Sequence, residues 1–159
     1  MQPLFEKWDQ ELWKKLQEDR QLGELSPKRN FELKIVGQIA LLLADLPMEV
    51  AATRDIDILH HIPYSQMKGL EKMFLDVGLV LERDQGLIWM PDDTVYHPLF
   101  SGKLAQVYYA DALDVMTSKA KYKRSKDKIL LRKYFKINSG AKEKIRQLGI
   151  DINWVEGKK

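Results

Sequence analysis

The sequence predicts a mixed α/β (α+β) fold, a mixed β-sheet flanked by helices, formed by residues 1–159 as one domain. Short segments with apolar residues in alternation or in continuous runs, which are typical of strands, are interleaved with segments of helical periodicity. The strands and helices do not follow a strict βαβ repeat, and this favours a mixed sheet over a purely parallel one. A length of 159 residues is that of one ordinary domain.

Composition excludes several kinds of site. The chain has no cysteine, so it has no disulfide, thiolate zinc site or cysteine nucleophile. Its balance of 45% hydrophobic and 31% charged residues is that of a globular domain rather than a disordered chain. The most apolar run, residues 35–46, is far shorter than the roughly 20 residues of a membrane span. The first residues lack the pattern of a secretory signal, so we expect a cytoplasmic protein with no membrane partner.

The N-terminal part of the chain predicts a helix, a strand and a second helix. The first helix covers about residues 4–22, where apolar residues recur every three or four positions, and it ends at Gly23. Residues 31–36 are a short apolar segment compatible with a strand that ends at Gly37. Residues 38–46 are apolar almost throughout, as in a buried helix, and Pro47 ends them.

The middle of the chain begins with a strongly patterned strand at residues 53–59. Acidic and aliphatic residues alternate there with period two, so Asp55 and Asp57 are expected to point to the same side. A helix with an apolar face follows and ends at Gly78. Residues 79–82 and 87–90 flank a glycine-containing connection, which is typical of a β-hairpin.

The C-terminal part predicts two strands, at residues 95–100 and 105–109, followed by a basic helical region over about residues 111–150. Either Asp111 or Asp114 is expected to cap its first helix. Residues 119–136 include nine basic residues and one acid, so this segment carries a charge of +8. The remainder of the chain carries −5, which gives the net charge of +3. Such a basic segment is typical of a protein that binds a phosphate-bearing partner. It is equally typical of a helix face that is only solvated.

The aspartate pair is the main candidate for chemistry. On a strand, Asp55 and Asp57 lie on one face, roughly 6.5 to 7 Å apart along the backbone. Carboxylate oxygens suit Mg²⁺ or Mn²⁺, and a carboxylate-bound metal paired with a second metal is the usual device for in-line phosphoryl or nucleotidyl transfer. Alternating acids also occur on ordinary exposed strands. Upstream, Gly37 lets the backbone come close to a ligand at the start of an apolar helix, where anionic phosphate is favoured.

Four features together carry a family resemblance: the helix that begins at Gly37, the segment Thr53-Arg54-Asp55-Ile56-Asp57, Lys119, and the cluster Arg124-Ser125-Lys126-Asp127. The arrangement resembles the nucleotidyltransferase superfamily that shares its catalytic module with DNA polymerase β. More narrowly, it looks like small bacterial stand-alone proteins related to the toxin nucleotidyltransferases of abortive-infection type IV toxin–antitoxin systems. The resemblance spans about residues 34–135 and implies a nucleotidyltransferase-like fold.

The resemblance also implies roles for individual residues. Asp55 and Asp57 would be catalytic and would bind the divalent metal, Mg²⁺ or Mn²⁺. The nucleoside triphosphate would be bound by Gly37, Gln38, Lys119 and Lys126. This chain has Gly37-Gln38 where the family has glycine-serine or glycine-glycine. A third carboxylate normally completes the set, and the candidates for it are Glu82, Asp92 and Asp93.

Two hypotheses of function follow. The first is a metal-dependent nucleotidyltransferase that moves a nucleoside monophosphate from a nucleoside triphosphate to a protein or RNA acceptor, with an antitoxin as a partner that the resemblance implies. The second is a catalytically inactive domain of the same fold, which binds RNA or a partner protein through its basic residues 119–136.

Overall fold

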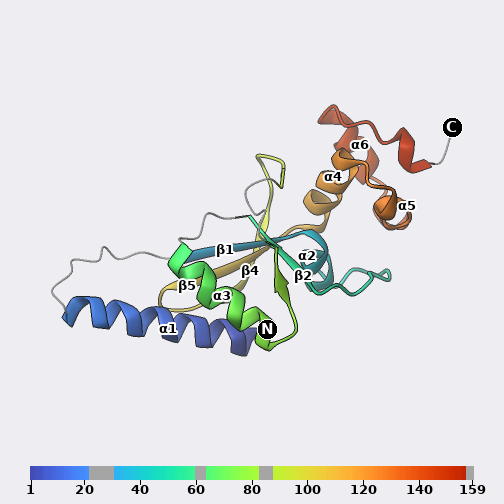
Figure 1. Cartoon of the computed structure of the whole chain (residues 1–159). Coiled ribbons are helices and arrows are strands. Elements are labelled where there is room, and N and C mark those ends of the chain that lie inside the picture. Colours follow the sequence, from blue (N-terminus) through green and yellow to red (C-terminus); the bar gives the residue numbers. More distant parts are fainter. Residues whose placement is uncertain (22–30, 60–63, 83–87, 157–159) are drawn as a thin grey trace.

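A five-stranded mixed sheet with helices around it organises the chain, and this confirms the predicted fold class (Figure 1). The computed structural model describes residues 1–21, 31–59, 64–82 and 88–156. The helices in these parts are α1 (Gln2–Gln21), α2 (Gly37–Leu43), α3 (Tyr64–Asp76), α4 (Ala112–Tyr122), α5 (Lys128–Ile137) and α6 (Ala141–Gln147), with 3-10 turns η1 (Ser125–Asp127) and η2 (Asn153–Glu156). The strands are β1 (Phe31–Val36), β2 (Asp55–Ile58), β3 (Val80–Leu81), β4 (Tyr96–Ser101) and β5 (Ala105–Ala110).

The strand order is β3-β2-β1-β5-β4, with β1 in the centre. Strand β1 runs parallel to β5 and antiparallel to β2, while β2 is parallel to β3 and β4 is antiparallel to β5. In this register Val36, the last residue of β1, lies opposite Asp57 of β2. The topology therefore places the second aspartate beside the residue that leads directly into α2.

Helices α1 and α3 lie side by side on one face of the sheet, whereas α4, α5 and α6 gather beyond one end of it (Figure 1). The apolar stripe predicted for the first helix is buried, at Leu4, Phe5, Trp8, Leu12 and Leu16. The ring of Phe5 packs edge-on against Phe74 of α3, with centroids 6.3 Å apart. The sheet face under α1 and α3 is thus the main core.

A buried carboxylate fastens α1 to the sheet. Asp9 is 8% exposed and accepts backbone N–H groups from Lys103 at 3.0 Å, Leu104 at 2.7 Å and Ala105 at 2.8 Å. A Cβ at the neighbouring Gly102 would lie 2.4 Å from the carboxylate carbon, so glycine allows this approach. Burial acts to raise the pKa of Asp9, but the three backbone hydrogen bonds outweigh it and the pKa is lowered.

We expect Asp9→Asn to lower the free energy of unfolding by about 2 to 3 kcal/mol at pH 7, because an amide cannot accept all three N–H groups. The pKa of Asp9 is lowered on folding, so its stabilisation is complete above the ordinary value of 3.8 and is lost as the pH falls through the folded value. Urea unfolding at pH 7 and pH 3 measures both effects. Glu11→Gln, at an exposed position of the same helix, is the control. An equal loss in both variants would contradict the prediction.

Two predicted elements differ from the structure. The apolar helix ends at Leu43 rather than near residue 46, and Leu42 is 39% exposed, so this helix is not buried all round. The hairpin prediction was wrong, because Val80–Leu81 pairs in parallel with β2 and residues 88–90 form no strand. Residues 88–90 are held instead by α4, through hydrogen bonds of Trp89. The connection predicted at residues 83–86 lies outside the described residues.

The turn from β5 into α4 is capped by Asp111, whose carboxylate accepts the N–H of Leu113 at 3.1 Å. Asp114, the alternative cap, instead accepts the N–H of Val95 at 2.9 Å. Helix α4 ends at Tyr122 and is followed by Lys123, a left-handed residue with φ of 53°, after which the chain turns back through η1 into α5. Among the described helices, none has the length and apolar character needed to cross a membrane.

Candidate functional site

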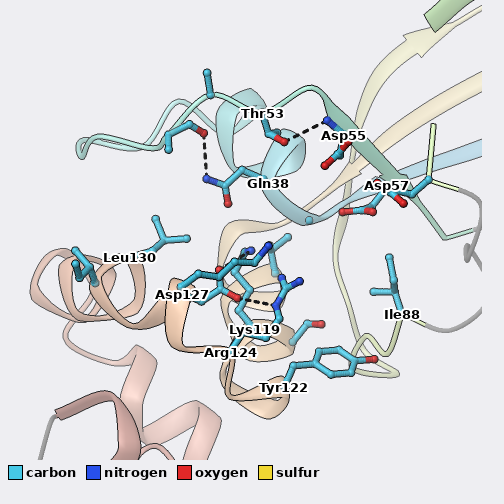
Figure 2. Close-up of a pocket in the computed structure, with 18 of the residues that line it drawn as sticks. Gln38, Thr53, Asp55, Asp57, Ile88, Lys119, Tyr122, Arg124, Asp127 and Leu130 are labelled. Atoms are coloured by element: carbon cyan, nitrogen blue, oxygen red, sulfur yellow. Dashed lines mark hydrogen bonds and ion pairs between the residues drawn. The ribbon is translucent and has the colours of Figure 1, made fainter. Parts of the chain in front are cut away.

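A cavity of about 870 Å³ lies where the end of the sheet meets α4 and α5 (Figure 2). Its lining includes all six residues that the sequence singled out for metal and nucleotide: Gly37, Gln38, Asp55, Asp57, Lys119 and Lys126. These residues come from α2, β2, α4 and η1, so segments up to about ninety positions apart converge on one volume. Glu82, one of the three candidates for a third carboxylate, also lines the cavity.

The alternation in β2 aims both aspartates at the cavity. Ile56 and Ile58 are fully buried on the opposite face of the strand, while Asp55 is exposed and Asp57 is half-buried. The hydroxyl of Thr53 accepts the N–H of Asp55 at 3.2 Å, which fixes the entry to the strand. Burial raises the pKa of Asp57, and the negative charge of Asp55 adds to this rise, whereas Lys119 opposes it.

Gly37 allows the start of α2 to approach Asp57 closely. Its φ is +70°, in the left-handed region that favours glycine. A Cβ at this position would lie 2.5 Å from Oδ2 of Asp57, so a larger residue would displace the carboxylate. The adjacent Gln38 turns toward the loop that precedes β2, and its Nε2 donates to the carbonyl of Ala51 at 3.1 Å. The Gln38 amide is therefore anchored to the wall of the cavity.

A cluster of cations lies across the cavity from the two aspartates (Figure 2). Lys119 is only 7% exposed, and its ammonium donates to Oδ1 of Asp127 at 3.2 Å. The Nε of Arg124 donates to the other oxygen, Oδ2, at 3.1 Å. Burial lowers the pKa of Lys119, and the charge of Asp127 opposes this effect. Together with Lys126 and Lys133, these side chains make one wall of the cavity basic.

Only part of the basic segment faces the cavity. Lys119, Arg124, Lys126 and Lys133 line it, whereas Lys121 lies over the ring of Trp89, 3.9 Å from its centroid. The sequence did not single out Asp127 as the anchor of this wall. The signal that could have found it is that Asp127 is the one acid among the nine basic residues of the segment.

The acids at the cavity suit a hard divalent cation. Mg²⁺ is usually bound by one or two protein carboxylates together with substrate phosphates and water, and Asp55 with Asp57 provides such a pair. Within residues 1–21, 31–59, 64–82 and 88–156, no group of three or more His, Cys, Asp or Glu side chains is placed to hold a metal by itself. Asp92 and Asp93 are exposed in the turn after Pro91 and are not part of the lining.

Comparison of the chain with protein families, with curated proteins and with solved structures found no match. Assignment of a function therefore depends on the chemistry of the cavity. Carboxylate oxygens on one wall attract a cation, and ammonium and guanidinium groups on the other attract an anion. The lining of the cavity thus combines acidic groups suited to a cation with basic groups suited to an anion.

Proposed function

We propose that this protein is a metal-dependent nucleotidyltransferase, which transfers a nucleoside monophosphate from a nucleoside triphosphate to a protein or RNA acceptor. One observation carries the proposal: Asp55 and Asp57 face Lys119 and Arg124 across a single cavity, which Lys126 also lines. A triphosphate with its divalent cation has the charge distribution that these two walls complement, and the cavity volume is within the usual range for ligand sites.

The reaction is an exchange of bonds at the α-phosphorus. A hydroxyl oxygen of the acceptor forms the new bond and gives up its proton to water, the bond from the α-phosphorus to the oxygen that bridges to the β-phosphate breaks, and pyrophosphate leaves with that oxygen. A bound divalent cation would neutralise charge on the transferred group. In this scheme Asp55 and Asp57 hold the cation, while Lys119, Arg124 and Lys126 bind the outer phosphates and stabilise the leaving pyrophosphate.

The proposal is tested by incubating the protein with labelled nucleoside triphosphates and Mg²⁺ or Mn²⁺. We expect metal-dependent binding and label transfer by the parent, and loss of both in the double variant Asp55→Asn, Asp57→Asn. Lys136→Ala, at an exposed position of α5 outside the cavity, is the matched control and should behave as the parent.

A different outcome favours the second hypothesis, an inactive domain that binds RNA or a partner protein. In that outcome the parent protein shows no metal-dependent nucleotide binding. It binds polyanions instead, and this binding weakens steeply as the salt concentration increases, because binding of phosphates by lysine releases counterions. The exposed Lys121, Lys123 and Lys136 would then carry the binding, and substitution of Asp55 and Asp57 would leave it unchanged.

A further inference from the structure

We propose that the part of the cavity formed by Tyr122, Ile88 and Met90 is a subsite for the nucleobase, which holds the base by stacking and apolar contact and does not read its edge. This inference rests on the proposed function, since it places one part of the same nucleotide. It adds what the charged walls do not provide, a surface for the uncharged end of the ligand.

Residues 88–90 form a short strap against α4. The N–H of Trp89 donates to the hydroxyl of Tyr122 at 2.7 Å, and the hydroxyl of Ser118 donates to the carbonyl of Trp89 at 2.6 Å. The ammonium of Lys121 lies over the Trp89 ring. Ile88 and Met90, on either side of Trp89, line the cavity. The strap therefore gives the cavity an aliphatic wall next to α4.

Tyr122 provides an aromatic ring at the same place. It is the last residue of α4, it lines the cavity and it is 46% exposed, so a ligand in the cavity can reach this side chain. The hydrogen bond from Trp89 restrains the ring through its hydroxyl. A restrained aromatic side chain loses little conformational freedom on binding, and any nucleobase has a face that can stack on it.

The apolar surface lies beside the charged walls of the same cavity. Ile88 and Tyr122 lie on the side of the cavity near Asp57, next to Lys119 and Arg124 (Figure 2). Phosphates held between the aspartates and the cations would leave the base at the apolar wall. A second apolar part of the lining, Ile129 and Leu130 of α5, is more open, since Ile129 is 65% exposed.

The chemistry of the subsite predicts weak selection among bases. Its side chains offer aliphatic groups and a ring, and the hydroxyls of Ser118 and Tyr122 are engaged by the backbone of Trp89. Strong discrimination requires polar groups that are left unpaired by the wrong ligand, whereas an apolar pocket discriminates poorly. We therefore expect the four common nucleoside triphosphates to bind within about tenfold of one another.

The test compares two ligands with Mg²⁺ by calorimetry: α,β-methylene nucleoside triphosphates, which cannot donate the nucleotidyl group, and inorganic tripolyphosphate, which has no base. In the parent the nucleotides should bind at least about fivefold more tightly than tripolyphosphate. Tyr122→Ala should weaken nucleotide binding by about 5- to 150-fold, the range for loss of one stacked base, and leave tripolyphosphate binding unchanged. Tyr122→Phe, which keeps the ring, should retain most of the affinity.

Tyr108→Ala is the control, because Tyr108 is a half-buried tyrosine of β5 outside the cavity lining. Three results would overturn the subsite and leave the proposed function standing. They are equal affinity of the parent for both ligands, unchanged nucleotide binding in Tyr122→Ala, and an equal loss of affinity for both ligands in that variant. A preference above about a hundredfold for one base would overturn the inference that the subsite does not read the edge of the base. Failure of both ligands to bind the parent with Mg²⁺ overturns the proposed function and the subsite with it.

Discussion

Asp57→Asn is expected to reduce metal-dependent nucleotidyl transfer by about 100- to 1,000-fold and to make the protein more stable at pH 7. The two effects have one cause. Burial and the charge of Asp55 raise the pKa of Asp57, which means that the folded protein disfavours the ionised carboxylate. Asparagine has nearly the same shape without the charge. The charge that a metal ion would require is therefore a cost to the fold when no metal is bound.

The pH dependence of stability follows from the same shift. Between the ordinary value of 3.8 and the raised folded pKa of Asp57, the folded state holds more protons than the unfolded state. The free energy of unfolding therefore falls as the pH rises through this interval, and the fall is complete above the folded pKa. The asparagine variant lacks this contribution, so its advantage over the parent should be absent below pH 3.8, should grow as the pH rises above 3.8, and should be complete above the folded pKa.

Urea unfolding of parent and variant without metal, at pH 3 and at pH 7, measures this advantage, and labelled transfer in Mg²⁺ measures the loss of activity. Asp92→Asn is the control, because Asp92 is exposed in a turn outside the cavity lining and should change neither quantity. A variant that keeps its transfer activity, or that is less stable than the parent at pH 7, would contradict the explanation.

The sequence was sufficient where the signal is local. The alternation of Asp55, Ile56, Asp57 and Ile58 predicted both the strand and the common direction of the carboxylates, and both aspartates line the cavity. The hairpin at residues 79–90 failed because its two halves look like strands but find other partners. Val80–Leu81 pairs with a strand more than twenty positions earlier, and residues 88–90 bind a helix about thirty positions later. Such partners are not encoded in local periodicity.

The sequence identified residues that line the cavity, but it did not predict the contacts that these residues make with one another. Lys119 was expected to line the nucleotide site and it does line the cavity, but its pairing with Asp127 was not expected, because Asp127 appeared in the sequence as an isolated acid in a basic run. Asp127 is buried where the chain reverses after Lys123 and η1 brings the Asp127 carboxylate to the ammonium of Lys119 in α4. Burial of a charge by a reversal of the chain has no periodic signal, so the anchor of the basic wall was not foreseen.

Removal of Asp127 is expected to lower the free energy of unfolding by about 3 to 5 kcal/mol, the range for breaking a buried ion pair from one side. Asp127 is 4% exposed and Lys119 is 7% exposed. In Asp127→Asn the lysine ammonium stays buried without its counter-charge. Lys119→Met should cost less, because Arg124 continues to pair with Asp127. Urea unfolding of the two variants measures this asymmetry.

The double variant Asp127→Asn, Lys119→Met shows whether an unpaired charge is the cause, because it should be more stable than Asp127→Asn alone. A second sign is the dependence on pH. Burial already lowers the pKa of Lys119 from 10.5, and loss of Asp127 lowers it further. The unfolded state then holds more protons, so the stability of Asp127→Asn should approach that of the parent as the pH rises toward 10.5. A deficit that is the same at pH 7 and pH 9.5, or that persists in the double variant, would mean that Asp127 acts through packing and not through the charge of Lys119.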